Sequence, residues 1–232
     1  MRDTRLILLE GPPGAGKSTT GELLAERLCR RGVNARYLFG FAPDHPIQTR
    51  CERLARRVFG GEEVPSPDLA RDDETVFTAP QWARLAASLA GGDEVLVVEG
   101  KYFQQCLEVP YLLGLAETEL FELQCELVDA MAPARPALLY FDVGDVAAHR
   151  AAVVKERPPT WPDTLGGFFA IHPWAKARGL AGRDAFAAFY DAWAPIEREL
   201  VERHGSPKLD LVEAHHDRDG AWTLIDAFLD PE

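Results

Sequence analysis

The sequence predicts an α/β protein: a doubly wound, five-stranded parallel sheet with helices on both faces and a lid segment. Three observations favour this class. Short apolar runs alternate with helix-like stretches along all 232 residues. A glycine-rich loop joins the first apolar run to the first helix. The apolar share of 47% is enough for the core of one large domain over residues 1–232.

Each expected strand is a short apolar run that turn residues bound. These strands are Arg5–Glu10, Val33–Phe39, Glu94–Glu99, Ala137–Val143 and Leu209–Val212. An unbroken apolar run such as Val95–Val98 is typical of a parallel strand buried on both faces. Helices are expected at about 16–31, 48–59, 81–90, 112–131, 146–156, 184–203 and 221–229. Ligands of such sheets lie beyond the carboxyl ends of the strands, so that edge should carry the functional residues.

Two segments show no clear periodicity. Residues 60–80 contain a glycine pair, three prolines and many carboxylates, which predicts a surface loop. This loop belongs to a predicted acceptor-side segment at about 40–80. Residues 157–182 are rich in Pro, Gly, Trp and Arg and are predicted to be irregular. The stretch of about 155–182 is therefore the predicted lid.

The octapeptide Gly11–Ser18, GPPGAGKS, matches the pattern G-x-x-x-x-G-K-[ST] between an apolar strand and a helix. Glycines let the backbone curl so that several N–H groups point into one concavity, where phosphate oxygens can bind. The helix that begins near Gly16 adds the positive end of its dipole. A glycine-rich turn before an ordinary helix is the alternative. The residues predicted to hold the triphosphate are Gly11, Pro12, Pro13, Gly14, Ala15, Gly16, Lys17, Ser18 and Thr19.

Further residues complete a predicted magnesium and phosphate site. Lys17 can reach the β- and γ-phosphates, and the Ser18 hydroxyl can ligate Mg²⁺. Glu99 ends an apolar strand near the loop, where its carboxylate can hold Mg²⁺ directly or through water. A simple strand-capping role is the alternative for Glu99. Lys101 could neutralise phosphate charge or could be solvated.

An acceptor hydroxyl needs a nearby carboxylate to orient it and to accept its proton. Asp44, which follows the second strand, is the predicted residue for this role. A turn-forming aspartate between two prolines is the alternative. Phe41, Tyr102 and Phe103 could stack on a flat acceptor, but for each one taken alone a core position is favoured over a ligand contact.

Arg150, Lys155 and Arg157 form a basic cluster in an otherwise acidic chain. We expect Arg150 and Arg157 to be delivered over the phosphates when the lid closes, where their charge stabilises phosphoryl transfer. The alternative is that these cations only stabilise the C-terminal end of the helix at 146–156.

The net charge of −12 disfavours binding to nucleic acids and to anionic membranes. No apolar run is long enough to span a bilayer, and the opening residues Met1–Arg5 do not resemble a signal peptide. The four cysteines show no C-x-x-C spacing. A cytoplasmic protein with a small-molecule acceptor is therefore expected, and a homodimer is compatible with the sequence.

The run Tyr140–Arg150, YFDVGDVAAHR, resembles the fourth-strand segment of thymidylate kinases and their relatives. The first strand, the phosphate-binding loop and Thr19-Thr20 resemble the same superfamily of P-loop nucleoside and nucleotide kinases. Glu99-Gly100-Lys101 occupies the position of the Asp-Arg or Glu-Arg pairs in these families, with the cation one position later. The resemblance implies Mg²⁺ binding at Glu99, acceptor handling near Asp44 and lid cations between Arg150 and Arg157.

The leading hypothesis is an ATP- and Mg²⁺-dependent phosphotransferase that moves the γ-phosphoryl group to a hydroxyl or phosphate of a small, nucleoside-like acceptor. The chain lacks the N-K-x-D motif with which G proteins read guanine. One alternative is a resistance-type O-phosphotransferase that modifies an antibiotic. Another is a non-catalytic module that binds ATP and signals through its lid.

Overall fold

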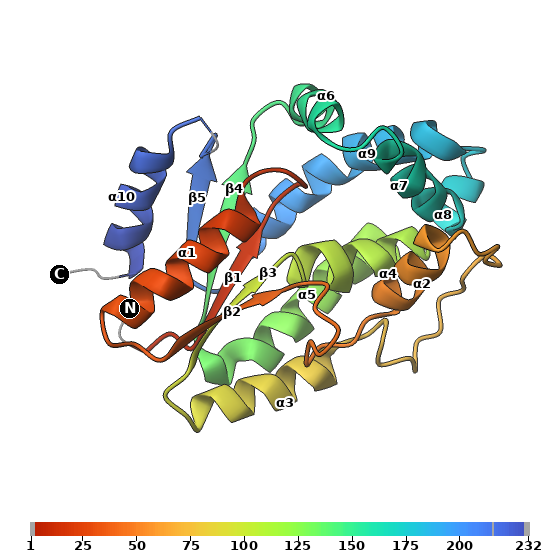
Figure 1. The fold of residues 1–232 in the computed structure, drawn as a ribbon. Helices are drawn as coiled ribbons and strands as arrows, with labels where there is room; N and C mark the ends of the chain where they lie inside the picture. The colour runs from red at the N-terminus through yellow and green to blue at the C-terminus, as the bar shows by residue number, and fades with distance from the viewer. Residues whose placement is uncertain (1–2, 215, 230–232) are drawn as a thin grey trace.

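The computed structural model describes residues 3–214 and 216–229, and its centre is a five-stranded sheet in the order β2-β3-β1-β4-β5 (Figure 1). Every neighbouring pair of strands is parallel. The strands are β1 (Leu6–Glu10), β2 (Ala35–Phe39), β3 (Val95–Glu99), β4 (Pro136–Asp142) and β5 (Lys208–Val212). The predicted fold class is confirmed, and the strands lie at nearly the expected bounds.

The first strand lies at the centre of the sheet. Leu6 of β1 is in register with Leu96 of β3 on one side and with Pro136 of β4 on the other. Because β1 has a neighbour on each side, the loop that follows it emerges in the middle of the carboxyl edge. The end of β3 lies beside this loop, since Leu9 is in register with Glu99.

Helices cover both faces of the sheet, as predicted (Figure 1). Alternate residues of β1 point to opposite sides, so that Leu6 and Leu8 join one apolar cluster while Ile7 and Leu9 join the other. The smaller cluster lies against α1 (Lys17–Arg30) and α10 (Arg218–Leu229). The larger cluster lies against α3 (Ala79–Ala90), α4 (Glu108–Leu112), α5 (Glu117–Met131) and α9 (Gly182–Arg203).

The helix predicted over 112–131 is confirmed as α5, but it begins at Glu117, and Leu112 ends the separate helix α4. The chain leaves α4 at Leu112 and enters α5 at Glu117, with Gly114 between them at a φ of 102°. This left-handed conformation suits glycine and ends the first helix. The Glu119 carboxylate then accepts the Ala116 N–H at 3.1 Å and caps the second helix. A π-helix, η1 (Tyr102–Leu107), leads directly into α4 and was not predicted.

The segment predicted to be a lid is largely helical, so the prediction of an irregular stretch at 157–182 was wrong. It contains α7 (Trp161–Ala170) and α8 (Pro173–Lys176), and it follows α6 (Val146–Glu156). Prolines suggested a loop, but Pro162 and Pro173 occupy first-turn positions, where proline costs a helix nothing. Glycines also suggested a loop, but Gly166 has a packing role, because a Cβ there would overlap the backbone of Gly182 in α9.

The predicted surface loop is confirmed in outline. Residues 60–78, all of which the structure describes, form no helix or strand. Before them lies α2 (Arg50–Phe59), which the Glu52 carboxylate caps by accepting the Thr49 N–H at 3.2 Å. The 3-10 helix η2 (Ala132–Ala134) completes the elements. No helix within the described ranges is long and apolar enough to cross a membrane.

Candidate active site

The loop between β1 and α1 has the shape of an anion cradle. Gly11, Gly14 and Gly16 adopt φ values of 134°, 83° and 98°, which favour glycine over any L side chain. A Cβ on Gly14 would also overlap the Val153 side chain of α6. No side chain caps the start of α1 at Gly16, so this helix end can bind an anion through its N–H groups.

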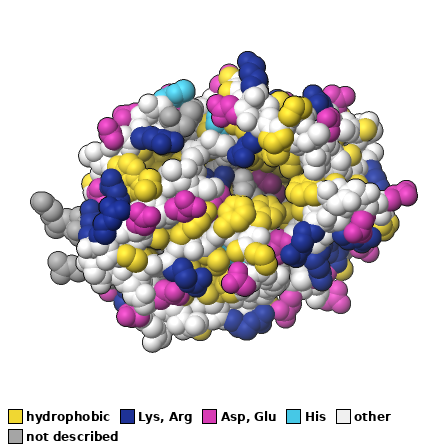
Figure 2. Space-filling model, in the orientation of Figure 1, with side chains coloured by type: hydrophobic (Ala, Val, Ile, Leu, Met, Phe, Trp, Pro, Cys, Tyr) yellow, Lys and Arg dark blue, Asp and Glu magenta, His cyan; other side chains and the backbone are white. Residues whose placement is uncertain are grey.

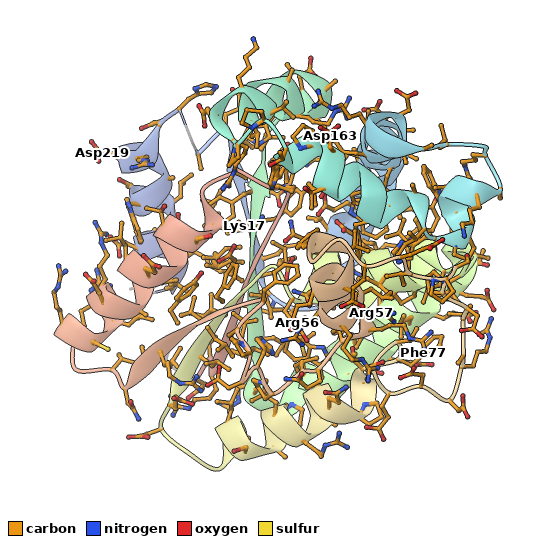
Figure 3. All side chains as sticks on the ribbon, turned by 45° about the vertical axis from the view of Figure 1, so that its right-hand side comes forward. Lys17, Arg56, Arg57, Phe77, Asp163 and Asp219 are labelled. Atoms are coloured by element: carbon orange, nitrogen blue, oxygen red, sulfur yellow. The ribbon has the colours of Figure 1, made fainter. Side chains whose placement is uncertain are left out.

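Lys17 is folded back over the same loop. Its ammonium group is almost fully buried and donates to the carbonyl oxygens of Gly11 at 2.7 Å and Pro12 at 2.9 Å. Burial lowers the pKa of Lys17, and the nearby carboxylates of Glu99 and Glu10 oppose that shift. Figure 3 shows Lys17 at the start of α1, across from α2. The lysine therefore lies at the cradle, where an incoming polyphosphate could replace its carbonyl partners.

Ser18 and Glu99 meet beside the cradle. The Ser18 hydroxyl donates to a carboxylate oxygen of Glu99 at 2.9 Å, and the Tyr37 hydroxyl donates to the other carboxylate oxygen. The oxygens of Ser18 and Glu99 are hard ligands of the kind that Mg²⁺ prefers. Magnesium bound with a nucleotide commonly takes one or two protein ligands and completes its shell with phosphates and waters. The donor set therefore fits a nucleotide-bound Mg²⁺.

A cavity of about 740 Å³ extends from the cradle toward the lid helices. Figure 2 shows apolar side chains gathered around a hollow on this face. Its charged lining residues are Lys17, Glu52, Arg56, Glu99, Glu108, Arg157 and Arg218. Its aromatic lining residues are Phe39, Phe41, Phe59, Trp161, Phe168, Phe169 and Tyr190. The volume suits a small molecule bound next to a polyphosphate tail.

Lys101 is part of the wall that supports this cavity and is not a phosphate ligand. Its side chain is fully buried, forms an ion pair with Glu52 and donates to Gln105 at 2.9 Å. Gln105 in turn accepts the Thr49 hydroxyl at 2.8 Å. This network joins α2 to η1, so the predicted alternatives of phosphate contact and solvation for Lys101 were both wrong.

Three buried glutamates surround the inner side of the site. Burial raises the pKa of Glu10 to about 8 and that of Glu197 to about 7, and Lys17 opposes both shifts. Burial also raises the pKa of Glu108 well above its usual value, and the negative charges of Glu197 and Glu10 raise it further. Only Glu108 of the three lines the cavity. The inner side of the site is thus rich in carboxylates that are costly to ionise.

The two predicted lid arginines have different surroundings. Arg157 is exposed, lines the cavity and lies 5.8 Å from the centre of the Trp161 ring. Arg150 does not line this cavity. It donates to Asp191 at 2.6 Å and to the Ala187 carbonyl at 3.2 Å, so it joins α6 to α9. Of the two predicted lid arginines, Arg157 lines the cavity, whereas Arg150 lines a small neighbouring pocket beside Pro12 and Pro13 of the loop.

Asp44 does not reach the cavity either. The segment after β2 turns His45 and Ile47 inward, so Asp44 beside them is exposed. Burial lowers the pKa of His45 to about 3, and its neutral ring accepts the Ile47 N–H at 3.0 Å. The predicted acceptor base is therefore on the outside of the loop. Phe41 does line the cavity, as one alternative allowed.

Sequence reasoning left a core position open for Tyr102 and Phe103, which the structure confirms, and it missed Tyr37 and Glu108 at the candidate site. Tyr102 and Phe103 are fully buried in the core and line no part of the cavity. Tyr37 on β2 was missed, and no local signal marks a hydroxyl that reaches Glu99. Glu108 was also missed, although a lone charge in the apolar run Cys106–Leu113 is a usable signal.

Comparison with known proteins identifies one curated relative. No family model matches the chain. Over 90 residues the chain is 39% identical to a shikimate kinase of Saccharopolyspora erythraea, a match that spans 39% of this chain and 41% of the relative. The match thus covers less than half the length of that relative. Among solved structures, a shikimate kinase from Acinetobacter baumannii in complex with shikimate aligns at 17% identity and a TM-score of 0.40.

That structural alignment covers 98% of this chain and 94% of the other. The fold class of this chain, an all-parallel α/β sheet with a phosphate-binding loop after its central strand, stands on its own sheet order and loop geometry. The likeness to thymidylate kinases expected from Tyr140–Arg150 is not confirmed by these comparisons.

Proposed function

We propose that this protein is an ATP- and Mg²⁺-dependent phosphotransferase that transfers the γ-phosphoryl group to a hydroxyl group of a small acceptor. One observation carries the proposal. The Ser18 hydroxyl and the Glu99 carboxylate meet at 2.9 Å beside the loop lysine, at the inner end of a cavity that can hold a second substrate. The local similarity to an enzyme named as a shikimate kinase supports the same class of reaction.

Each residue at the cradle has a distinct role in this proposal. The N–H groups that begin α1 bind phosphate oxygens, and Lys17 exchanges its carbonyl partners for the β- and γ-phosphates. Ser18 and Glu99 would hold Mg²⁺, which supplies positive charge to the polyphosphate. Arg157, at the edge of the lid, adds a further cation on the open side.

The protein would supply mainly positioning and charge. Phosphoryl transfer passes through a loose transition state, so it needs aligned oxygens more than a strong base. The absence of Asp44 from the cavity lining is compatible with this chemistry. The nucleoside-like acceptor expected from the sequence stays a prediction, which the aromatic lining of the cavity supports.

The test is a screen for ADP formation stimulated by an acceptor. The probes are shikimate, thymidine, cytidine, thymidine monophosphate and an aminocyclitol antibiotic, each with ATP and Mg²⁺. We expect at least one compound to raise ADP formation about 100-fold over slow hydrolysis, and we expect Lys17→Ala to abolish the stimulation. ATP binding without stimulation by any acceptor would favour the non-catalytic ATP-binding alternative and would contradict the proposal.

A further inference from the structure

Glu108 is a buried carboxylate that faces the cavity without a partner. Its side chain is 6% exposed and lines the cavity. Within residues 3–214 and 216–229, no donor lies at hydrogen-bonding distance from its oxygens, and no cation forms an ion pair with it. Glu52, which lines the same cavity, is by contrast neutralised by Lys101 and accepts the Thr49 N–H. Of the three carboxylates that line the cavity, Glu52 and Glu99 thus have partners among the described residues and Glu108 lacks one.

An irregular helix directly precedes Glu108. The π-helix η1 ends at Leu107, and Glu108 is the first residue of α4. The residues on both sides, Leu107 and Val109, are buried in the apolar core. Widened helical turns of this kind occur frequently at functional sites, where they redirect single side chains. Burial of an unpaired carboxylate costs free energy, which a ligand of opposite charge could recover.

The electrostatic surroundings of Glu108 favour a cation. Glu197 and Glu10 add negative charge when they are ionised, and Lys17 opposes this effect. Because burial raises the pKa values of these glutamates, an ammonium group bound beside Glu108 would favour the ionised form of its carboxyl group. In the proposed reaction Lys17 binds the negatively charged polyphosphate. Its positive charge would then offset less of the negative charge of the glutamates. The chain as a whole carries a net charge of −12, which attracts cations and repels anions.

The cavity that Glu108 lines also has aromatic walls. Trp161, Phe168 and Phe169 contribute to them from α7, and Tyr190 contributes from α9. The faces of aromatic rings attract ammonium groups, and this attraction increases when water is excluded. A carboxylate combined with several aromatic rings is therefore suited to a protonated amine on an apolar body.

We propose that this cavity binds a protonated amino group of the acceptor, with Glu108 as its ion-pair partner and the aromatic rings around its apolar part. The inference rests on the proposed phosphotransferase function and narrows the acceptor to ring-bearing amino alcohols. Arg56, an exposed cation at the α2 side of the cavity, offers the competing arrangement, in which an anionic acceptor binds there instead.

The experiment compares three probes that share one ring and differ in one group. They are 2-phenylethylamine, 2-phenylethanol and phenylacetate, titrated by ligand-observed NMR into the full chain with Mg²⁺ and a non-hydrolysable ATP analogue. We expect the amine to bind at least tenfold more tightly than the alcohol and phenylacetate to bind most weakly. Equal binding of the three probes, or tightest binding of phenylacetate, would overturn the inference.

Variants then assign the preference to one residue. Glu108→Gln keeps the size of the side chain but removes its charge, so the preference for the amine should disappear, whereas Glu108→Asp should keep part of it. Glu63→Gln, at an exposed position outside the cavity, is the control and should leave the preference unchanged. A preference that persists in Glu108→Gln would refute the assignment, and thermal unfolding checks that each variant is folded.

Binding of the ATP analogue to the same samples separates the two proposals. If the analogue binds and the amine preference is absent, the inference on the acceptor fails while the phosphotransferase proposal stands. If the analogue does not bind, the phosphotransferase proposal fails, whatever the probes do.

Discussion

The hydroxyl of Ser18 donates a hydrogen bond at 2.9 Å to the carboxylate of Glu99, which lies 81 positions later in the chain. The first residue belongs to the helix after the central strand, and the second residue ends the neighbouring strand β3. Parallel pairing of β1 with β3 brings these strand ends together. Two oxygens that suit Mg²⁺ thereby converge at the cradle, and Tyr37 orients one of them from β2.

Glu99→Gln should weaken the binding of Mg²⁺ at the active site. An amide oxygen carries no full charge, so we expect the apparent affinity for Mg²⁺ to fall at least tenfold and turnover to fall about 100-fold. Acceptor-stimulated ADP formation over a range of Mg²⁺ concentrations measures both effects. Tyr37→Phe, which keeps the carboxylate, is the matched control and should cost much less. Unchanged Mg²⁺ dependence in Glu99→Gln would rule out the metal role.

Lys101→Met should destabilise the fold strongly. It leaves Glu52 as a buried carboxylate without its cation, at a cost of about 3–5 kcal/mol in the free energy of unfolding. Adding Glu52→Gln removes the orphaned charge and should recover part of the loss. Urea denaturation measures these changes. The exposed pair Arg36 and Glu94 is the control, since Arg36→Met should cost less than about 1 kcal/mol. If Lys101→Met lowered the free energy of unfolding by no more than Arg36→Met does, the structural role of Lys101 would be contradicted.

Glu10 and Glu197 should each contribute a loss of stability as the pH rises, from about 4.5 to 8 for Glu10 and from about 4.5 to 7 for Glu197. Burial, opposed by Lys17, raises the pKa values of Glu10 and Glu197 to about 8 and 7, above the usual 4.5. In that window each glutamate binds more protons in the folded state than in the unfolded chain, so it lowers the free energy of unfolding by roughly 1.4 kcal/mol per pH unit until its folded pKa is passed. Below pH 4.5 neither group contributes a slope. Burial lowers the pKa values of His45, His172 and His204, so these three groups contribute in the opposite direction up to their usual value of 6.5.

Glu10→Gln and Glu197→Gln test this origin of the pH dependence. Each amide is neutral at every pH, so the urea midpoint of each variant should rise relative to that of the wild-type chain as the pH increases from about 4.5. This relative rise should continue to about pH 7 for Glu197→Gln and to about pH 8 for Glu10→Gln. Parallel profiles for the three proteins would exclude these carboxylates as the source.

Gly166→Ala should destabilise the contact between α7 and α9. A methyl group there would overlap the backbone of Gly182, so the helices must separate, at about 1–3 kcal/mol. Gly167→Ala is a neighbouring control, because its added Cβ would lie 3.7 Å from a methyl carbon of Val58. Alanine is the better helix former, so this control should be neutral or stabilising by up to about 1 kcal/mol. Similar thermal unfolding of the two variants would show that the helices adjust freely.

Much of the fold could be predicted from local patterns. The apolar runs predicted all five strands, and Gly11–Ser18 predicted the cradle. Both predictions were possible because strand burial and loop conformation depend on residues close in sequence. The lid helices were missed because Pro162 and Gly166 were read as helix breakers. Whether a helix can contain these residues depends on the position of Pro162 in the first turn and on the close approach of α9 to Gly166.

The side-chain partners could not be predicted in the same way. Asp44 and Arg150 have suitable chemistry and suitable places along the chain, yet one points outward and the other joins α6 to α9. Glu108 has no motif, but the π-helix before it and the apolar residues around it bring it to the cavity.

By itself the sequence determined the alternation of strands and helices and the anion cradle, since both follow from short-range periodicity and from glycine conformation. Only the tertiary structure decided which charged groups are paired, which are buried and which face the cavity. Those properties depend on how segments far apart in the chain pack together, and packing sets the local dielectric and the available partners of each charge.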